Sequence, residues 1–131
     1  MNNRLTKQEV QDLLLWLNHR HALVTVPDIL IELTGDLRSA VFLARCMELA
    51  ATSDNFTFAR PAKDWEDELK ISTYVVGEMR KKLARWITTE THHSNNIPVT
   101  HYTVNFKQLY TDLLGIDQQD DEPNGKIESL F

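Results

Sequence analysis

The segment from Phe56 to Phe106 changes its hydrophobic period along its length, and this change restricts the fold more than any other feature of the sequence. Phe56-Thr57-Phe58 alternates like a short strand, and apolar residues then recur at helical spacing in two stretches. After Trp86 the spacing becomes two, which is typical of strands. The sequence therefore predicts a strand, two helices and a β-hairpin, in an α+β fold that is mainly α.

Local signals place the two helices of this segment. Pro61 suits the first turn of a helix that ends near Leu69, and Ser72 is a good N-cap for the next helix. We predict that second helix over Thr73–Trp86. Its inward side is predicted to consist of the apolar residues of one stripe: Val76, Met79, Leu83 and Trp86.

Two strands and a polar loop follow these helices. The strands are predicted over Ile87–Thr91 and Val99–Phe106, and the loop between them over residues 92–98. Two helices joined by a short turn and followed by a hairpin form a winged helix-turn-helix. The polar loop is then expected to be the wing of this fold.

The chain before this segment predicts three further helices. Thr6-Lys7-Gln8-Glu9 is a capping box for a helix that ends near His19. A short β-rich run at 23–26 precedes a short helix over Asp28–Leu33, which Gly35 is expected to stop. Asp36 is a plausible N-cap for a helix over 37–51, which is apolar around most of its circumference and should form the centre of the core.

The chain after the hairpin predicts a closing helix and an acidic tail. The helix is expected over Phe106–Leu114, with Gly115 at its end, and little fixed structure is expected from Ile116 onward. Residues 1–114 carry 13 Lys or Arg and 14 Asp or Glu, whereas residues 115–131 carry one Lys and five Asp or Glu. The predicted organisation is an N-terminal helix (1–21), a winged helix-turn-helix domain (22–114) and a flexible acidic tail (115–131).

The charge on the second helix of the helix-turn-helix favours DNA binding. Thr73–Trp86 carries four basic residues against Glu78, and a helix of this kind fits the major groove. Gly77 is costly inside a helix, so a close approach to DNA or to another helix would explain it. The candidate DNA-binding residues of this helix and of the wing are Ser72, Thr73, Tyr74, Gly77, Arg80, Lys81, Lys82, Arg85, His92, His93 and Asn95.

Several stretches of the chain resemble the winged-helix domain of phage and prophage replication initiators. They are PAKDWEDELKISTYVV (61–76), RKKL (80–83), HYTVN (101–105) and, upstream, LVTVP (23–27) and TGDLRSA (34–40). The same domain opens DnaD-like primosomal proteins and some plasmid Rep proteins. The resemblance covers roughly residues 22–114, and it implies a protein that binds double-stranded DNA in replication initiation or in its regulation.

The resemblance leaves a second class of function open. Initiators of this type usually continue into a domain that loads the helicase, so a chain that stops at Phe131 is expected to be a fragment or a stand-alone winged helix. A stand-alone version also fits a protein-interaction module, such as a phage-encoded inhibitor or adaptor of a host complex. The charge of the preceding helix does not favour DNA binding, since residues 63–70 carry a net charge of −2 beside the expected DNA surface.

The N-terminal helix and the tail each have two interpretations. The apolar stripe of the helix either packs on its own domain or forms a homodimer contact. The acidic tail either keeps the protein soluble or occupies the basic helix as a mimic of nucleic acid.

Other functions find little support in the sequence. It holds no Walker loop, nucleophile elbow or dinucleotide fingerprint, so we expect neither an enzyme nor a cofactor. Five histidines lack a Cys pair or a carboxylate at ligand spacing, so we expect no metal site. No apolar run is long enough for a membrane span, and no signal peptide is evident. With Cys46 as its only cysteine, the chain is expected to be cytoplasmic.

Overall fold

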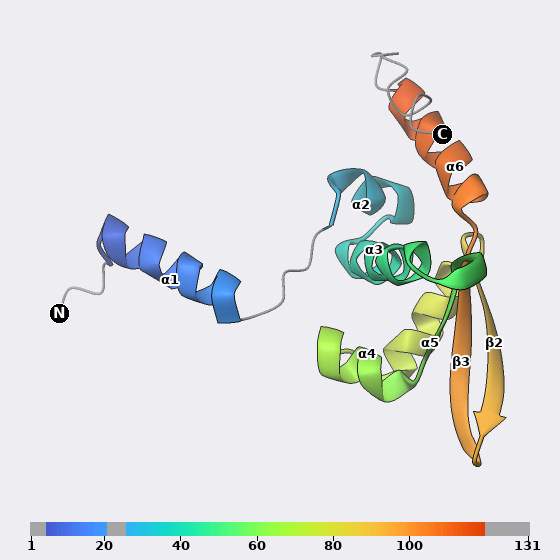
Figure 1. Ribbon diagram of the computed structural model, residues 1–131. Coiled ribbons are helices and arrows are strands. Elements are labelled where there is room, and N and C mark those ends of the chain that lie inside the picture. Colours follow the sequence, from blue (N-terminus) through green and yellow to red (C-terminus); the bar gives the residue numbers. More distant parts are fainter. Residues whose placement is uncertain (1–4, 21–25, 120–131) are drawn as a thin grey trace.

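The computed structural model describes residues 5–20 and 26–119 (Figure 1). Over these residues the chain is α+β and mainly helical, with six α-helices and one three-stranded antiparallel sheet. None of the described helices combines the length and the apolar character that a membrane span needs. In chain order the elements are α1 Lys7–Arg20, α2 Asp28–Thr34, α3 Leu37–Ala51, a 3₁₀ turn Asp54–Phe56, β1 Thr57–Arg60, α4 Ala62–Leu69, α5 Thr73–Lys82, β2 Ile87–Ser94, β3 Ile97–Val104 and α6 Phe106–Gln119.

The first helix, α1, begins at the predicted capping box. The Glu9 amide donates to Thr6 Oγ1 over 3.1 Å, and the Thr6 amide donates to Glu9 Oε1 over 3.0 Å. The apolar stripe of this helix stays exposed, and α1 stands apart from the elements that follow (Figure 1). Among residues 5–17 and 26–119, packing of the stripe on its own domain, one of the two interpretations above, is therefore not observed.

The predicted starts and ends of α2 and α3 are confirmed. Gly35 follows α2 with a φ of 91°, in the left-handed region that glycine adopts without strain. Asp36 caps α3, since its carboxylate accepts a hydrogen bond from the Ser39 amide over 2.8 Å. The predicted run 37–51 matches α3, and most of the side chains that it buries are apolar. This helix lies at the centre of the core, as expected.

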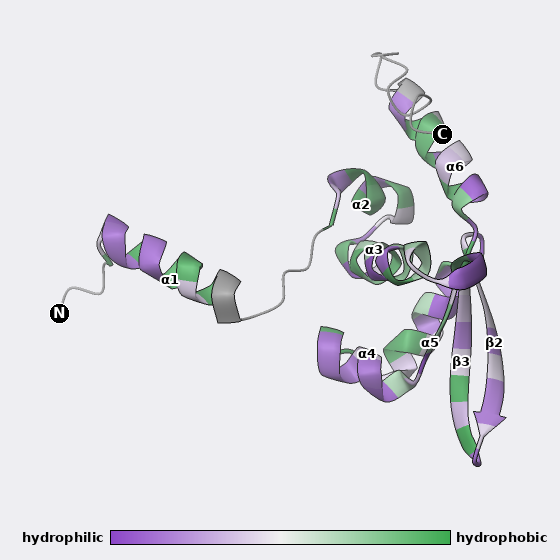
Figure 2. Ribbon diagram, in the orientation of Figure 1, coloured by the Kyte–Doolittle hydropathy of each residue, from purple (hydrophilic) through white to green (hydrophobic). Residues whose placement is uncertain are grey.

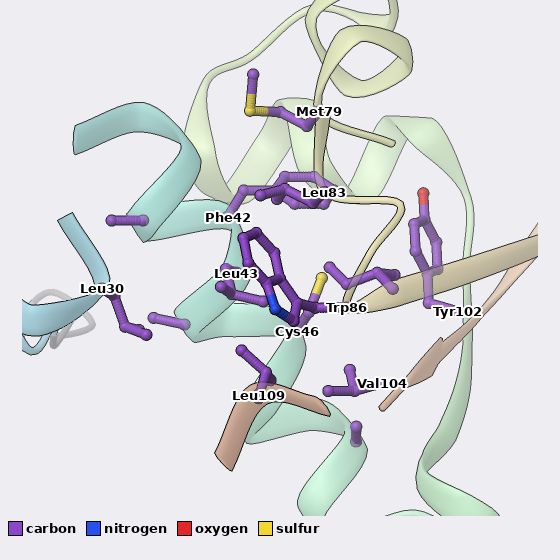
Figure 3. Close-up of a cluster of buried hydrophobic side chains, with 14 of the residues drawn as sticks. Leu30, Phe42, Leu43, Cys46, Met79, Leu83, Trp86, Tyr102, Val104 and Leu109 are labelled. Atoms are coloured by element: carbon purple, nitrogen blue, oxygen red, sulfur yellow. The ribbon is translucent and has the colours of Figure 1, made fainter. Parts of the chain in front are cut away.

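The core joins α3 to the segments around it (Figure 3). Phe42, Leu43 and Cys46 project from α3, and Trp86 lies among them, with Leu109 of α6 close by. Each of these five side chains is at least 92% buried. Burial raises the pKa of the Cys46 thiol well above its ordinary value, so Cys46 acts as a small apolar side chain of the core.

The sheet places β3 in the centre, in the order β1-β3-β2. Both pairings are antiparallel, with Phe58 opposite Tyr102 and Ile87 opposite Val104. The chain therefore leaves the sheet after β1, forms α4 and α5, and returns as the β2–β3 hairpin. The outer edge of the hairpin is β2.

The hairpin is longer and its turn is tighter than predicted. Only Asn95 and Asn96 separate β2 from β3, so the predicted loop over 92–98 is wrong. Their φ values of 52° and 64° lie in the left-handed region, which Asn tolerates better than most residues and which a two-residue hairpin turn requires. Pro98 is accommodated in β3 because β1 ends before this level of the sheet.

The last helix also differs from the prediction. α6 continues through Gly115 to Gln119, so the predicted end at Gly115 is wrong. Glycine inside a helix lowers the stability of the helix by only about 1 kcal/mol relative to alanine. Packing of the helical residues before and after Gly115 can offset this loss. Leu109 is buried, while Leu113 and Leu114 are half-buried. The apolar run at 23–25 and the tail from residue 120 lie outside the described residues.

One ion-pair network ties α3, β1 and α4 together. The Glu68 carboxylate accepts hydrogen bonds from Arg45 Nε over 2.7 Å and from Arg60 Nη2 over 3.0 Å. Hydrogen bonds from Arg45 first, and then from Arg60, lower the pKa of Glu68 from 4.5 to about 2. Glu68 is therefore a charged link between three elements.

Acid should weaken this link. Because the folded-state pKa of Glu68 is depressed, its stabilisation is present above pH 4.5 and is lost as the pH falls toward 2. We expect Glu68→Gln to lower the free energy of unfolding by about 1–2 kcal/mol near neutral pH, and to reduce the further loss of stability below pH 4.5. Urea unfolding at several pH values measures both effects, and parallel curves for the two proteins would contradict the assignment.

Candidate nucleic-acid interface

A tight connection sets α5 against α4. Lys70 adopts a left-handed conformation with a φ of 59°, and its amide donates to the Glu66 carbonyl over 2.9 Å at the end of α4. Two residues later, Ser72 Oγ accepts a hydrogen bond from the Val75 amide over 3.2 Å and caps α5. The start predicted for this helix is confirmed.

The inward side of α5 is the predicted one. Val76 and Met79 are buried within the helix, and Leu83 and Trp86 are buried just after it. The opposite side leaves Thr73 exposed, and Tyr74 is 75% exposed. The exposed side of the first turn of α5 thus presents the hydroxyl of Thr73 and the aromatic ring of Tyr74.

Gly77 has a less definite role. It is half-buried, and no atom lies within 4 Å of the position that a Cβ would take. The close approach that we expected at this glycine is therefore not made to another helix among the described residues. An approach to DNA stays a prediction.

The helix α5 ends at Lys82, so the predicted extension to Trp86 is wrong. The Trp86 and Ile87 amides both donate to the Leu83 carbonyl over 2.9 Å, which forms a turn in place of a further helical turn. Leu83 and Trp86 still point inward, so the hydrophobic spacing of a helix persists through a segment that is not helical.

Most cations of this region already have partners within the protein. Arg80 donates to Thr89 Oγ1 of β2 over 3.2 and 3.1 Å, and Lys82 forms an ion pair with Asp36 at the start of α3. The side chain of Lys81 is 81% exposed and lies 3.9 Å from Glu78, which is beyond a hydrogen bond. Lys81 is consequently the cation of α5 most available to a phosphate.

Arg85 lies in the turn after α5 and faces α6. Its Nε and Nη2 donate to the two oxygens of Asp112 over 2.6 and 3.0 Å. Asp112 also accepts from Trp86 Nε1 over 2.7 Å and from Gln108 Nε2 over 3.1 Å. The Arg85 guanidinium is the main cause of the pKa of Asp112 lying well below its usual range. Arg85 therefore fastens α6 to the end of α5.

The hairpin supplies the second half of the candidate surface. It runs beside α5 and extends past it (Figure 1), and Arg80 links the two through Thr89. His92, His93 and Asn95 are exposed near its tip, and Ile97 beside the turn is 60% exposed. The predicted wing residues thus lie at the end of a paired hairpin and not in a long loop.

Acidic side chains border this surface on the side of α4. Asp64, Glu66 and Asp67 are exposed, whereas Glu68 is paired with Arg45 and Arg60. Figure 2 shows α4 as hydrophilic along most of its length. The described part of the interface therefore carries little excess positive charge.

The histidines of the hairpin lie close to one another and to a carboxylate. His92 lies against His101, with ring centroids 4.7 Å apart, and its Nε2 is 3.6 Å from Glu90 Oε2. Over residues 5–20 and 26–119, no group of three or more His, Cys, Asp or Glu side chains is arranged to hold a metal ion.

In comparisons with known proteins, no family model, no curated protein and no solved structure matches this chain.

The sequence did not indicate the partners of the cations. Thr89, Asp36 and Asp112 come from three different elements, up to 46 residues away from the cations that they bind. The one usable signal was the N-cap position of Asp36, which placed its carboxylate at a helix start but not next to Lys82.

Proposed function

We propose that this protein binds double-stranded DNA through a winged helix-turn-helix, with α5 as the reading helix and the β2–β3 hairpin as the wing. The observation that carries the proposal is the sheet order β1-β3-β2 with the α4–turn–α5 unit inserted between β1 and β2. This is the arrangement that helix-turn-helix proteins of the winged type use to set a helix beside a hairpin.

The N-terminal part of α5 enters the major groove in this proposal. Thr73 and Tyr74 face base edges, and the capped helix start directs free amides toward a phosphate. Lys81 lies next to the sugar-phosphate backbone, and His92, His93 and Asn95 of the hairpin contact a neighbouring groove or phosphates. Arg80, Lys82 and Arg85 hold α5 in place through Thr89, Asp36 and Asp112.

The biological role in this proposal is replication initiation or its regulation, in a phage, prophage or plasmid. The sequence resemblance over residues 22–114 supports this role. A cytoplasmic location follows from the same role.

Titration of a short DNA duplex into the isotope-labelled protein tests the proposed surface. We expect the amide signals of Thr73, Tyr74 and Lys81 to shift, together with those of the hairpin tip, while signals from α6 stay in place. Shifts confined to α1, or no shifts at all, would contradict the proposal.

A second candidate function is a protein-interaction module, and one observation favours it. The stripe of α1 formed by Val10, Leu13, Leu14 and Leu17 is 39–53% exposed, which suits binding to an apolar surface of another protein. Such a contact tolerates salt, whereas DNA binding through phosphates weakens steeply as the salt concentration rises. Salt dependence therefore separates the two candidates.

A further inference from the structure

The outer edge of the sheet is long and unprotected. β2 spans Ile87–Ser94 and pairs with β3 on one side, and no described strand lies on its other side (Figure 1). Natural edge strands are usually short, or carry proline, lysine or a bulge that prevents pairing with another chain. β2 has no proline or lysine and keeps a continuous register with β3. Its edge is therefore open to another strand.

The hydrogen bonds of the hairpin show which backbone groups face this edge. The Asn105 amide donates to the Trp86 carbonyl over 2.8 Å, directly beyond the paired residues Ile87 and Val104. In an antiparallel strand, alternate residues direct their backbone groups to opposite sides. The even-numbered residues of β2 thus bond to β3, and the backbone groups of Thr89, Thr91 and His93 point to the open edge.

We propose that β2 pairs antiparallel with β2 of a second copy of this chain, with the two-fold axis at Thr91. In this register Thr91 lies opposite Thr91 of the other copy, and Thr89 lies opposite His93 of the other copy. All of these residues have backbone groups that point to the edge, so the ladder of hydrogen bonds is complete. The two sheets then form one continuous sheet.

Side-chain charge selects this register. With the axis at Thr91, Glu90 of each copy lies opposite His92 of the other, so two carboxylate–imidazole pairs form across the axis. Moving the axis by one residue places either two Glu90 carboxylates or two His92 rings opposite each other. In the single chain both side chains are exposed, and His92 Nε2 lies 3.6 Å from Glu90 Oε2. Each side chain can therefore leave this partner and pair with the other copy.

The composition of the strand suits a specific contact. β2 is hydrophilic along most of its length (Figure 2), with threonine and histidine at most positions. Polar β-branched residues pair well across strands without the apolar area that drives aggregation. This contact differs from a dimer through α1. It forms without DNA, and it uses His92 and His93, which the proposed function assigns to the DNA surface.

Sedimentation velocity on the full chain tests the pairing, over a concentration series that reaches about 100 µM because a small polar interface is expected to be weak. We expect a dimer, and His92→Glu should raise its dissociation constant at least about tenfold, since Glu90 then faces a carboxylate in both pairs. Glu90→His, which makes the net charge less negative, should also weaken it.

The double variant Glu90→His with His92→Glu is the matched control. It has the composition and net charge of the natural chain and restores both pairs, so its dissociation constant should return to within about threefold of the original. Far-UV circular dichroism and thermal midpoints verify that each variant is folded. A monomer at all concentrations, or no recovery in the double variant, would overturn the proposal.

The same measurement separates the two dimer contacts. Leu13→Glu with Leu17→Glu should leave the strand-paired dimer intact. A folded monomer from this variant, with the β2 variants still dimeric, would overturn the proposal and assign the contact to α1.

Discussion

Replacing Trp65 by alanine is expected to lower the free energy of unfolding by about 3–5 kcal/mol, the largest effect of any single substitution proposed for this chain. Trp65 is fully buried and projects from α4 into the core. Its ring stacks on Phe42 of α3 with centroids 4.3 Å apart, and Arg60 of β1 lies 4.4 Å above it. Its removal therefore leaves a cavity where three elements meet.

The indole of Trp65 also has a polar contact that a second variant isolates. Its Nε1 donates to the hydroxyl of Tyr102 in β3 over 3.0 Å. Tyr102→Phe keeps the ring and leaves the indole N–H without its partner, so we expect a smaller cost of about 1–3 kcal/mol. Urea unfolding followed by far-UV circular dichroism measures both variants. A loss below about 1 kcal/mol for Trp65→Ala would contradict the packing described for α4.

The second large effect concerns DNA. Lys81→Glu is expected to weaken binding to duplex DNA at least about tenfold, because it removes a phosphate contact and adds a repelling charge. Since the Lys81 side chain is 81% exposed, the fold should be unchanged by circular dichroism. The loss should be similar for all duplex sequences, because a phosphate contact carries no sequence information. Fluorescence anisotropy with labelled duplexes measures it.

Arg85→Ala is the control for this prediction. Arg85 is basic and exposed like Lys81, but its guanidinium is bound to Asp112. We expect this variant to lower the thermal midpoint, since α6 loses its link to the end of α5, and to leave DNA affinity within about threefold. Equal losses of affinity in Arg85→Ala and Lys81→Glu would contradict the placement of Lys81 at the interface.

Sequence reasoning was most successful at the starts of helices. Thr6, Asp36 and Ser72 each cap a helix at the predicted position, and Gly35 ends α2 as expected. A cap depends on a side chain and a backbone amide three residues away, so the signal lies within one short stretch of sequence. For the same reason the inward residues of α5 could be predicted from their spacing.

The ends of elements were harder to predict. Leu83 and Trp86 keep the spacing of a helix, although the chain has already turned toward β2. At the hairpin, a polar sequence indicated a loop, but Asn95 and Asn96 supply the two left-handed residues of a tight turn. In both cases the pairing of β2 with β3 decides the outcome, and neither the hydrophobic spacing nor the polarity of the local sequence indicates this pairing.

At the candidate site, too, local features could be predicted from the sequence, whereas contacts with distant residues could not. The sequence predicted the exposed residues Thr73, Tyr74 and Lys81, because an amphipathic helix has one outer face. It gave no indication that Arg80 and Arg85 would be held by side chains of β2 and α6. A count of positive charges on a helix therefore overstated the charge available to DNA.

The most direct test of DNA binding is the anisotropy of a labelled random duplex titrated with the full chain at about 50 and about 200 mM salt. Because contacts to phosphates release counterions, the proposed interface predicts binding at the lower salt concentration and an affinity at least about tenfold weaker at the higher one. No binding at either concentration, or an affinity that does not change with salt, would contradict DNA binding through α5 and the hairpin.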